Sequence, residues 1–524
     1  MPEPTTRESR HVAASPLTAS VVGGLRWSYT STLLVTVLQI GVTAVLARLL
    51  VPSAFGLVAM ASLFLRFGQY FAEMGAGQAV VQRADLSERD VHTAFTSAAL
   101  LGGIFALVFA AAAPLASILY PDTAGVVAVT RVMALTFVIG GLTSTTQALL
   151  RRRFGFRAIA LTEMGTYILG YATIALLLAS AGFGAWSLVA ASLAQGALAA
   201  AVYLALCRRQ LGFALAWGSL RSIYSYGGRI SLIGFLEFIA TSLDTLWTGH
   251  FLGAGPTGLY TRSKNMAVAP LYQFTTSLSR VLLPAFSRIQ TERERLGGTY
   301  LASVMVVVAI AAPVAWGVAG SAHEVVLTLL GPKWVEAVPP LAVLSLAVPF
   351  TLVMHLSAVS CDAVAALRIR LVITVARIGW LVVLLVALGH MGVTGVAVAC
   401  SVSEVLTMLA YQLVMRRLLG ATAAQLWRAH SVGVGSGIVT GLTLFALHSA
   451  LSAAHWPPVL ILLVQVLVGA VILVASITRA RGSVVWIEIR SRLQSAGLGH
   501  GEKGAGAAMF RGLDRLAGRR SASA

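Results

Sequence analysis

The stretch GLYTRSKNMAVAPLYQFTTSLSRVLLPAF, residues 258–286, has the length of a membrane-spanning helix but carries cations and amides along it. At about 100° per residue, its main polar side chains fall on one face of the helix: Arg262, Asn265, Gln273, Thr276 and Arg280. A charge that faces hydrocarbon costs about 2.5–3.5 kcal/mol even on the lenient insertion scale. We therefore expect this face to line a hydrated, positively charged cavity.

The composition indicates an integral membrane protein. Of its residues 57% are hydrophobic and only 11% charged, and the mean hydropathy of +0.84 is far from that of soluble globular chains. Apolar segments of about 20 residues, long enough to span a bilayer, can be placed at 27–50, 54–74, 92–113, 126–148, 158–180, 183–206, 226–250, 257–286, 298–320, 338–360, 368–389, 392–415, 431–450 and 458–478. The prediction is an all-α polytopic protein with about 14 transmembrane helices.

Arginine and lysine are concentrated in alternate connections between these segments. RRRFGFR (151–157) and RIQTERER (288–295) are examples, whereas LYPDTAG (119–125) and SAGFGAW (180–186) contain neither residue. Cytoplasmic loops carry such an excess of cations, so both termini are predicted to be cytoplasmic. The same rule accounts for the net charge of +19 without a nucleic-acid partner.

The chain contains a weak internal repeat. A shift of 202 positions places RLLVPSAFGL (48–57) over HFLGAGPTGL (250–259) and aligns Gly56 with Gly258. Duplicated halves are common in transporters. We expect an N-terminal cytoplasmic tail, two pseudo-symmetric six-helix lobes around a central cavity, two additional helices and a basic cytoplasmic tail, at 1–25, 26–207, 208–417, 418–478 and 479–524 in that order. The basic tail either lies on an anionic membrane surface or is solvated.

Polar stripes also mark the first, second and seventh predicted spans. Their candidate functional members are Gln39 in the first span, Arg66, Gln69 and Glu73 in the second, and Glu237 and Asp244 in the seventh. Arg66 is near the middle of its span, and an ionisable residue within a membrane is by default a candidate functional residue. If the two halves face each other, these spans and residues 258–286 form the walls of one cleft.

Structural explanations remain open for several charges. Four cations lie near span ends, where long cationic side chains reach the interface: Arg48, Arg262, Lys264 and Arg280. Glu237 and Asp244 are alternatively the counter-ions of Arg66 or Arg377. The other isolated charges are interpreted as packing or interface residues: Glu163, His355, Asp362, Arg377 and Glu404. Five histidines at predicted outer ends show no ligand spacing: His250, His323, His390, His448 and His455.

Several enzyme motifs are absent from the sequence. It has no G-x-x-x-x-G-K-[ST] phosphate loop, no G-x-S-x-G and no H-E-x-x-H. Cys207, Cys361 and Cys400 have neither disulfide nor zinc spacing, and the short connections leave no outer catalytic domain. These absences favour a transporter over an enzyme, with no metal, no cofactor and no intrinsic ATP motor.

Three stretches resemble a known family. ARLLVPSAFGLVAM (47–60), FAEMGAGQAVVQR (71–83) and GLYTRSKNMAVAPL (258–271), which continues to LLPAFSRIQTERERL (282–296), are similar to the polysaccharide and oligosaccharide flippases of the multidrug/oligosaccharidyl-lipid/polysaccharide superfamily. The likeness is to the O-antigen and colanic-acid type. It implies two lobes with alternating access, and a polyprenyl-diphosphate-linked oligosaccharide moved from the cytoplasmic to the outer leaflet of the inner membrane.

With such a substrate, roles can be assigned to the stripes. Guanidinium groups bind phosphate oxygens in bidentate fashion, and amides bind sugar hydroxyls. We expect Arg66, Arg262 and Arg280 to bind the diphosphate, with Arg48 and Lys264 as outer supports. The sugar-binding candidates are Gln39, Gln69, Asn265 and Gln273, and the candidates for coupling to H⁺ or Na⁺ are Glu237, Asp244 and Glu73.

Three other functions remain open. A peptidoglycan-precursor flippase would use the same chemistry on a smaller sugar. A cation-coupled drug antiporter of the same superfamily would need an acidic, aromatic-lined cavity, for which the acidic face at Asp244 is the only sequence support. A scaffold that recruits a polymerase or glycosyltransferases would act through its basic tail.

Overall fold

The structure is a computed structural model that describes residues 34–73, 77, 80–81, 86–121 and 123–479. All regular secondary structure in these residues is helical, and no strand occurs among them. A helix occupies the described part of every predicted span, beginning with Leu34–Leu49. The predicted all-α fold class is therefore confirmed. The predictions for both tails fall on residues outside the described ranges.

The chain divides into two compact units. The first comprises residues up to Leu50 and Met60–Phe235, and the second comprises Val51–Ala59 and the chain from Leu236 onward. Helix α2 (Pro52–Glu73) and helix α11 (Trp217–Leu252) therefore contribute residues to both units. Each unit is described separately below.

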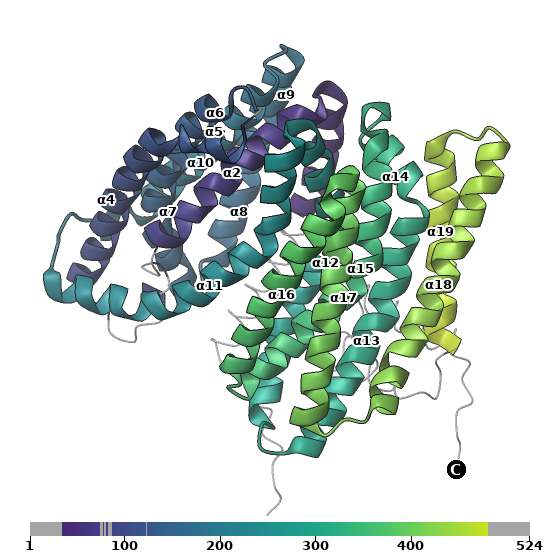
Figure 1. Ribbon diagram of the computed structural model, residues 1–524. Helices are drawn as coiled ribbons and strands as arrows, with labels where there is room; N and C mark the ends of the chain where they lie inside the picture. Colours follow the sequence, from purple (N-terminus) through teal and green to yellow (C-terminus); the bar gives the residue numbers. More distant parts are fainter. Residues whose placement is uncertain (1–33, 74–76, 78–79, 82–85, 122, 480–524) are drawn as a thin grey trace, which may run out of the picture. The chain divides into compact units, whose positions relative to one another are not determined.

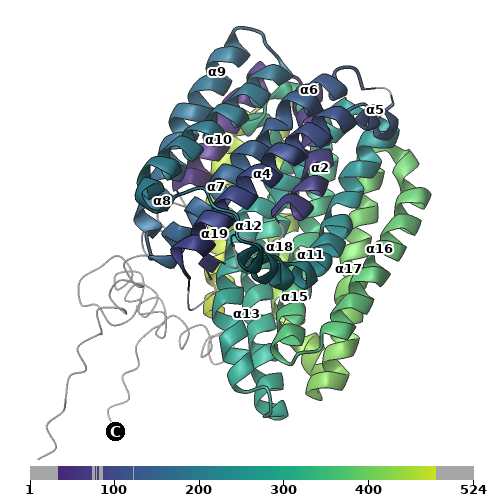
Figure 2. The same cartoon turned by 90° about the vertical axis from the view of Figure 1, so that its left-hand side faces the viewer.

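The first unit is built mainly from α4 to α10 (Figures 1 and 2). Its elements are α4 (Glu88–Ala112), α5 (Leu115–Leu119), α6 (Val126–Met133), α7 (Leu135–Arg152), α8 (Phe156–Thr166), the π-helical η1 (Tyr167–Ala172), α9 (Thr173–Ser180), α10 (Ala185–Cys207) and the 3₁₀ turn η2 (Arg208–Gln210). The helices α4 and α7 pack closely because Gly102 and Gly141 lie between them. A Cβ on Gly102 would lie 2.5 Å from the Phe137 carbonyl oxygen, and one on Gly141 would lie 2.4 Å from that of Ala98.

The helix Leu34–Leu49 also belongs to the first unit, and the second unit contains the helices that follow α11. After α11 they are α12 (Ala254–Arg288), α13 (Arg293–Gly320), α14 (Ala322–Leu329), the 3₁₀ turn η3 (Pro332–Ala337), α15 (Val338–Ala363), α16 (Leu367–Leu388), the 3₁₀ turn η4 (Gly389–Met391), α17 (Gly392–Leu419), α18 (Ala423–Ala453) and α19 (Pro458–Arg479). In its core, the buried Tyr300 hydroxyl on α13 lies 2.7 Å from Ser357 Oγ on α15 and accepts from Gln412 Nε2 on α17 at 3.0 Å. One buried polar group thus joins three helices.

The helices have the length and surface of membrane spans. Among the described residues, nine helical stretches are long and apolar enough to cross a membrane, and the longest, Leu367–Leu419, contains both α16 and α17. Large apolar side chains stay exposed on them: Leu107 is 74% exposed, and Val383 and Val471 are 66% and 68% exposed. Exposed apolar surface on this scale marks contact with lipid rather than water. The protein is an integral membrane protein, and the number of about 14 crossings stays a prediction.

The starts of α2 and α12 touch through two glycines. A Cβ on Gly56 would lie 1.8 Å from the Ala254 carbonyl oxygen, and a Cβ on Gly258 would lie 1.9 Å from the Pro52 carbonyl oxygen. The contact is reciprocal: the 202-residue shift found in the sequence turns the pair Gly56 and Ala254 into the pair Gly258 and Pro52. Only glycine lets two helix backbones come this close.

Substitution of either glycine should destabilise the second unit. The methyl group of Gly56→Ala or Gly258→Ala overlaps a backbone oxygen that cannot move aside, and overpacking of this kind costs about 1–3 kcal/mol. We expect a lower midpoint of thermal unfolding in detergent for both variants. The control is Gly255→Ala, because nothing lies within 4 Å of a Cβ at that position of α12. Equal midpoints for all three variants would contradict the close contact.

Candidate functional site

Asp244 on α11 is the centre of a buried polar cluster in the second unit. Its carboxylate is 6% exposed and accepts a hydrogen bond from Lys264 Nζ on α12 at 2.5 Å. The Tyr260 hydroxyl on α12 donates to the same oxygen at 2.6 Å, and the Thr245 backbone N–H donates to the other at 2.6 Å. Cys400 Sγ on α17 lies 3.7 Å away. The negative charge is therefore fully compensated by its neighbours.

Two further ion-pair sets extend from α16. Arg370 contacts Glu237 on α11 and donates from Nη1 to Asp362 Oδ2 on α15 at 2.5 Å. Arg377 contacts Glu404 on α17, and these two side chains are only 16% and 15% exposed. Because an unpaired charge is costly in low-dielectric surroundings, these pairs fix how α11, α15, α16 and α17 meet.

Arg262 is held against the start of α2. Its guanidinium carbon lies 4.2 Å from the centre of the Phe55 ring, a cation–π contact. Phe55 in turn packs edge-on against Trp334 of η3, with ring centres 5.3 Å apart, and Trp334 is completely buried. The guanidinium is therefore positioned by a rigid aromatic pair next to the Gly56–Gly258 contact.

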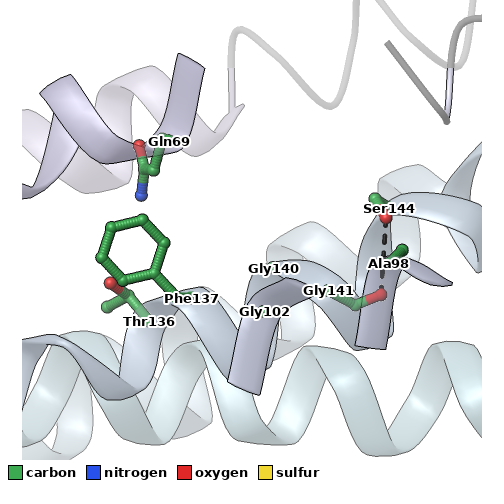
Figure 3. Close-up of a pocket in the computed structure, with 8 residues that line it drawn as sticks. All are labelled: Gln69, Ala98, Gly102, Thr136, Phe137, Gly140, Gly141 and Ser144. Atoms are coloured by element: carbon green, nitrogen blue, oxygen red, sulfur yellow. Dashed lines mark hydrogen bonds between the residues drawn. The ribbon is translucent and has the colours of Figure 1, made fainter. Parts of the chain in front are cut away.

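The first unit contains a small pocket between α2, α4 and α7 (Figure 3). Its lining residues are Gln69, Ala98, Gly102, Thr136, Phe137, Gly140, Gly141 and Ser144. Figure 3 shows the Gln69 amide pointing toward the Phe137 ring. The Thr136 and Ser144 hydroxyls of the lining donate to the carbonyl oxygens of Met133 and Gly141, which leaves them as acceptors. The Gln69 amide adds donors and an acceptor, and such groups bind sugar hydroxyls.

Arg66 lies one turn before Gln69 on α2 and is exposed. It makes no hydrogen bond or ion pair with the described residues. Residues three apart on a helix share a face, so Arg66 and the pocket amide lie on the same side of α2. Among the predicted cations, this one is available for an anionic ligand.

The structure places the other predicted residues in different settings. Gln39, Arg48 and Asn265 are exposed on their helices. Glu73, Gln273 and Arg280 belong to α2 and α12, but their side chains lie outside the described residues. In the second unit, Lys264 and Asp244 form an ion pair, and Arg262 contacts the Phe55 ring. Arg66 and Gln69 lie in the first unit.

The sequence-based alternative that made Glu237 and Asp244 the counter-ions of Arg377 is wrong, because within the second unit Glu237 contacts Arg370 and Asp244 contacts Lys264. Arg377 instead pairs with Glu404, which the sequence analysis left as an isolated packing residue.

Tyr260 is a site residue that the sequence analysis missed. It stands four residues before Lys264, a spacing that places both on one helical face.

These features define the class: a polytopic, all-helical membrane protein with compensated charges on apolar helices. Residues 45–339, more than half of the chain, match the family described as "Polysaccharide biosynthesis protein", so the chain belongs to this family.

The curated relatives are distant in sequence. The chain is 24% identical over 333 residues to the teichuronic acid biosynthesis protein TuaB of Bacillus subtilis, which covers 63% of this chain and 68% of that protein. It is 28% identical over 330 residues to the succinoglycan biosynthesis transport protein ExoT of Rhizobium meliloti, covering 62% and 66%. It is 25% identical over 338 residues to the lipopolysaccharide biosynthesis protein WzxC of Escherichia coli, covering 63% and 67%.

Solved structures share the fold. The lipid II flippase MurJ in an inward closed conformation superposes with a TM-score of 0.68 over 86% of this chain and 97% of that chain, at 10% identity. An inward-facing multidrug resistance MATE transporter of the MOP superfamily gives 0.53 over 74% and 95%, at 15% identity. These likenesses show a shared fold, and the predicted resemblance to polysaccharide biosynthesis proteins is confirmed by the family match.

The Lys264–Asp244 pair gives a direct test of the buried cluster. Lys264→Met leaves the Asp244 carboxylate without its cation; because the Lys264 side chain is 30% exposed, we expect a loss of about 1–3 kcal/mol in unfolding free energy. The double variant Asp244→Asn/Lys264→Met should recover part of this loss. Thermal and denaturant unfolding in detergent measure both.

A matched control is the exposed pair of Arg295 and Glu292, whose side chains are 68% and 53% exposed. Arg295→Met should change stability by less than about 1 kcal/mol. A Lys264→Met effect no larger than this control would argue against a buried pair.

Proposed function

We propose that the protein is a flippase that moves a polyprenyl-diphosphate-linked oligosaccharide from the cytoplasmic to the outer leaflet by alternating access, for polysaccharide biosynthesis. The family match over residues 45–339 carries the proposal. It is supported by relatives named for teichuronic acid, succinoglycan and lipopolysaccharide biosynthesis. The fold shared with a lipid flippase and a drug transporter suits a transport cycle with no catalytic step.

The diphosphate is the part of this substrate that opposes transfer through a bilayer. A buried anion without a partner is costly, and a guanidinium group offers paired donors to phosphate oxygens. We assign this contact first to Arg66, which is exposed and makes no ion pair with the described residues. Gln69, one turn away on the pocket wall, then binds the first sugar. Arg262 and Arg280 are assigned to the diphosphate as well, with Arg48 as an outer support.

Lys264 has a different role in this scheme. Without substrate it is bound to Asp244 and to the Thr241 carbonyl oxygen, 2.9 Å away. A diphosphate carries more negative charge than one carboxylate and competes for the ammonium group. Asp244 would then keep its donors from Tyr260, Thr245 and Cys400 but no cation, a state that favours uptake of H⁺ or Na⁺ by the carboxylate. Substrate and ion binding are thus coupled through one lysine.

The remaining parts of the proposal concern the setting of the protein. We place it in the cytoplasmic membrane with both termini in the cytoplasm, because cations concentrate in alternate connections. We infer that it binds lipid-linked oligosaccharide and works alongside a polymerase and glycosyltransferases. Gln39, Asn265 and Gln273 are further candidates for sugar contacts, and Glu237 and Glu73 are further candidates for ion coupling.

Removal of the Arg66 guanidinium should impair transport without unfolding the protein. In a host strain that lacks its own flippase and is complemented by this chain, Arg66→Ala should lower polymer export at least about tenfold, the cost of losing one charged hydrogen bond. Polymer export by Arg66→Lys should lie between that of Arg66→Ala and that of the wild type, since lysine keeps the charge but not the paired donors. Export is measured as surface polymer at matched protein levels.

Arg131 provides the control for this experiment. It is also an exposed arginine of the first unit, in the last turn of α6, and it is not one of the residues that line the pocket. Arg131→Ala should export normally. Full export by Arg66→Ala would refute the assignment, whereas failure of the wild-type chain to restore any polymer would refute the flippase proposal.

The coupling role of Asp244 predicts a dependence on an ion gradient. In proteoliposomes with a fluorescent lipid-linked oligosaccharide, a proton or sodium gradient should raise the flipping rate of the wild type. Asp244→Asn, which cannot bind the ion as a carboxylate does, should lose this response, while Glu292→Gln in the exposed pair should keep it. Equal wild-type rates with every gradient collapsed would remove the coupling role.

A further inference from the structure

Three potential metal ligands meet at one end of the second unit. His323 and Glu324 are adjacent on α14, and His448 comes from α18. Glu324 is completely buried. Its Oε1 contacts His448 Nδ1 and lies 3.5 Å from His323 Nδ1. One ligating atom from each residue can be chosen so that all lie within 4.8 Å of one another.

The packing of α13 against α18 brings these residues together. A Cβ on Gly320, at the end of α13, would lie 2.4 Å from the Gly441 carbonyl oxygen of α18. Gly441 and His448 are seven residues apart, two helical turns, and therefore lie on the same face of α18. Since α14 begins directly after α13, this close contact presents the start of α14 to His448.

The cluster is incompletely satisfied by protein groups. Glu324 Oε2 is buried and makes no hydrogen bond to the described residues, and neither does His323 Nδ1. A buried carboxylate oxygen with no donor costs free energy that a cation would offset. The ring centres of His323 and His448 are 4.9 Å apart, with Glu324 Oε1 in contact with both residues. Two imidazoles and one carboxylate thus converge on one small volume.

We propose that His323, Glu324 and His448 bind a divalent transition-metal ion of the Zn²⁺ class. Two imidazole nitrogens and one carboxylate oxygen suit Zn²⁺ and its Co²⁺ and Ni²⁺ analogues rather than Mg²⁺ or Ca²⁺, which prefer oxygen ligands. Ligand bonds of about 2.0–2.2 Å require the Glu324–His448 contact to open and His323 to move inward. The side chain of His323 is 40% exposed, so an ion can reach the site past it. Three protein ligands leave the fourth coordination position for a water molecule.

The ion would fasten the C-terminal helices to the rest of the second unit. His448 is on α18, and α19 is joined to α18 near the site because buried Gln465 donates to the Leu444 carbonyl oxygen at 3.0 Å. An ion bound between α14 and α18 therefore stabilises the packing of α18, and of α19 that is joined to it, against α13 and α14. This role does not depend on the transport proposal.

Metal content and stability of the full chain test the site. The protein is purified in detergent without a histidine tag, treated with a chelator, and given equimolar Zn²⁺. We expect about one Zn²⁺ per chain after gel filtration, a raised unfolding midpoint, and no such rise with Mg²⁺. With Co²⁺ we expect the visible absorption of a low-symmetry, four-coordinate site. Retention of no Zn²⁺, or an unchanged midpoint, would overturn the proposal and leave a simple Glu324–His448 pair.

Variants then locate the ion. His323→Ala, Glu324→Gln and His448→Ala should each weaken Zn²⁺ affinity at least about 10–100-fold, the range for loss of an outer-shell partner alone. His455→Ala, an exposed histidine just beyond the end of α18, should bind as the wild type does. Glu324→Gln preserves side-chain size, and gel filtration checks that each variant is folded. Equal affinity in all four variants would show adventitious binding elsewhere and overturn the assignment.

Discussion

Asp244 needs compensation for its charge, and this need organises the centre of the second unit. Asp244 lies on α11 among apolar helices, where it accepts hydrogen bonds from Lys264 and Tyr260 of α12 and lies beside Cys400 of α17. Stripping a charge of water costs several kcal/mol unless partners replace the solvent. The rotation of α11 and α12 about their own axes is therefore fixed, since any other rotation would separate the carboxylate from Lys264 and Tyr260. The Arg370 and Arg377 pairs apply the same constraint to α16.

The contact of Gly56 and Gly258 determines where two cations of α12, Arg262 and Lys264, lie. Because the backbones of α2 and α12 touch there, Arg262, one turn beyond Gly258, reaches the Phe55 ring beside Gly56. Lys264 follows about 9 Å along the axis from Gly258 and reaches Asp244. A wider helix separation would break the ring contact. The repeat is most visible in residues 48–57 and 250–259 because both stretches must keep a glycine at this contact.

The sequence predicted the helices better than their contacts. Hydrophobic length located the helices because apolar surface must match the bilayer core. The cavity expected from the polar stripe of α12 stays a prediction. Periodicity, however, defines only which residues share a face of one helix. Glu237 and Arg370 are 133 residues apart, and His448 and Glu324 are 124 apart. Such partners follow from how helices distant in sequence pack together, which no local spacing encodes.

The difference between Arg66 and Lys264 fits what a transport cycle requires. A carrier must bind its substrate in one state and release it in another. Some of its cations should therefore bind the anion only after they break an ion pair within the protein. Arg66 makes no ion pair with the described residues and can attract a diphosphate at long range. Lys264 must first leave Asp244, so the free energy of that pair is subtracted from its contribution to binding. In the proposed cycle, Asp244 takes the lysine back when the substrate departs, so that no bare ammonium remains among apolar helices during the return step. On this proposal, weak net binding by Lys264 is a consequence of its pairing with Asp244.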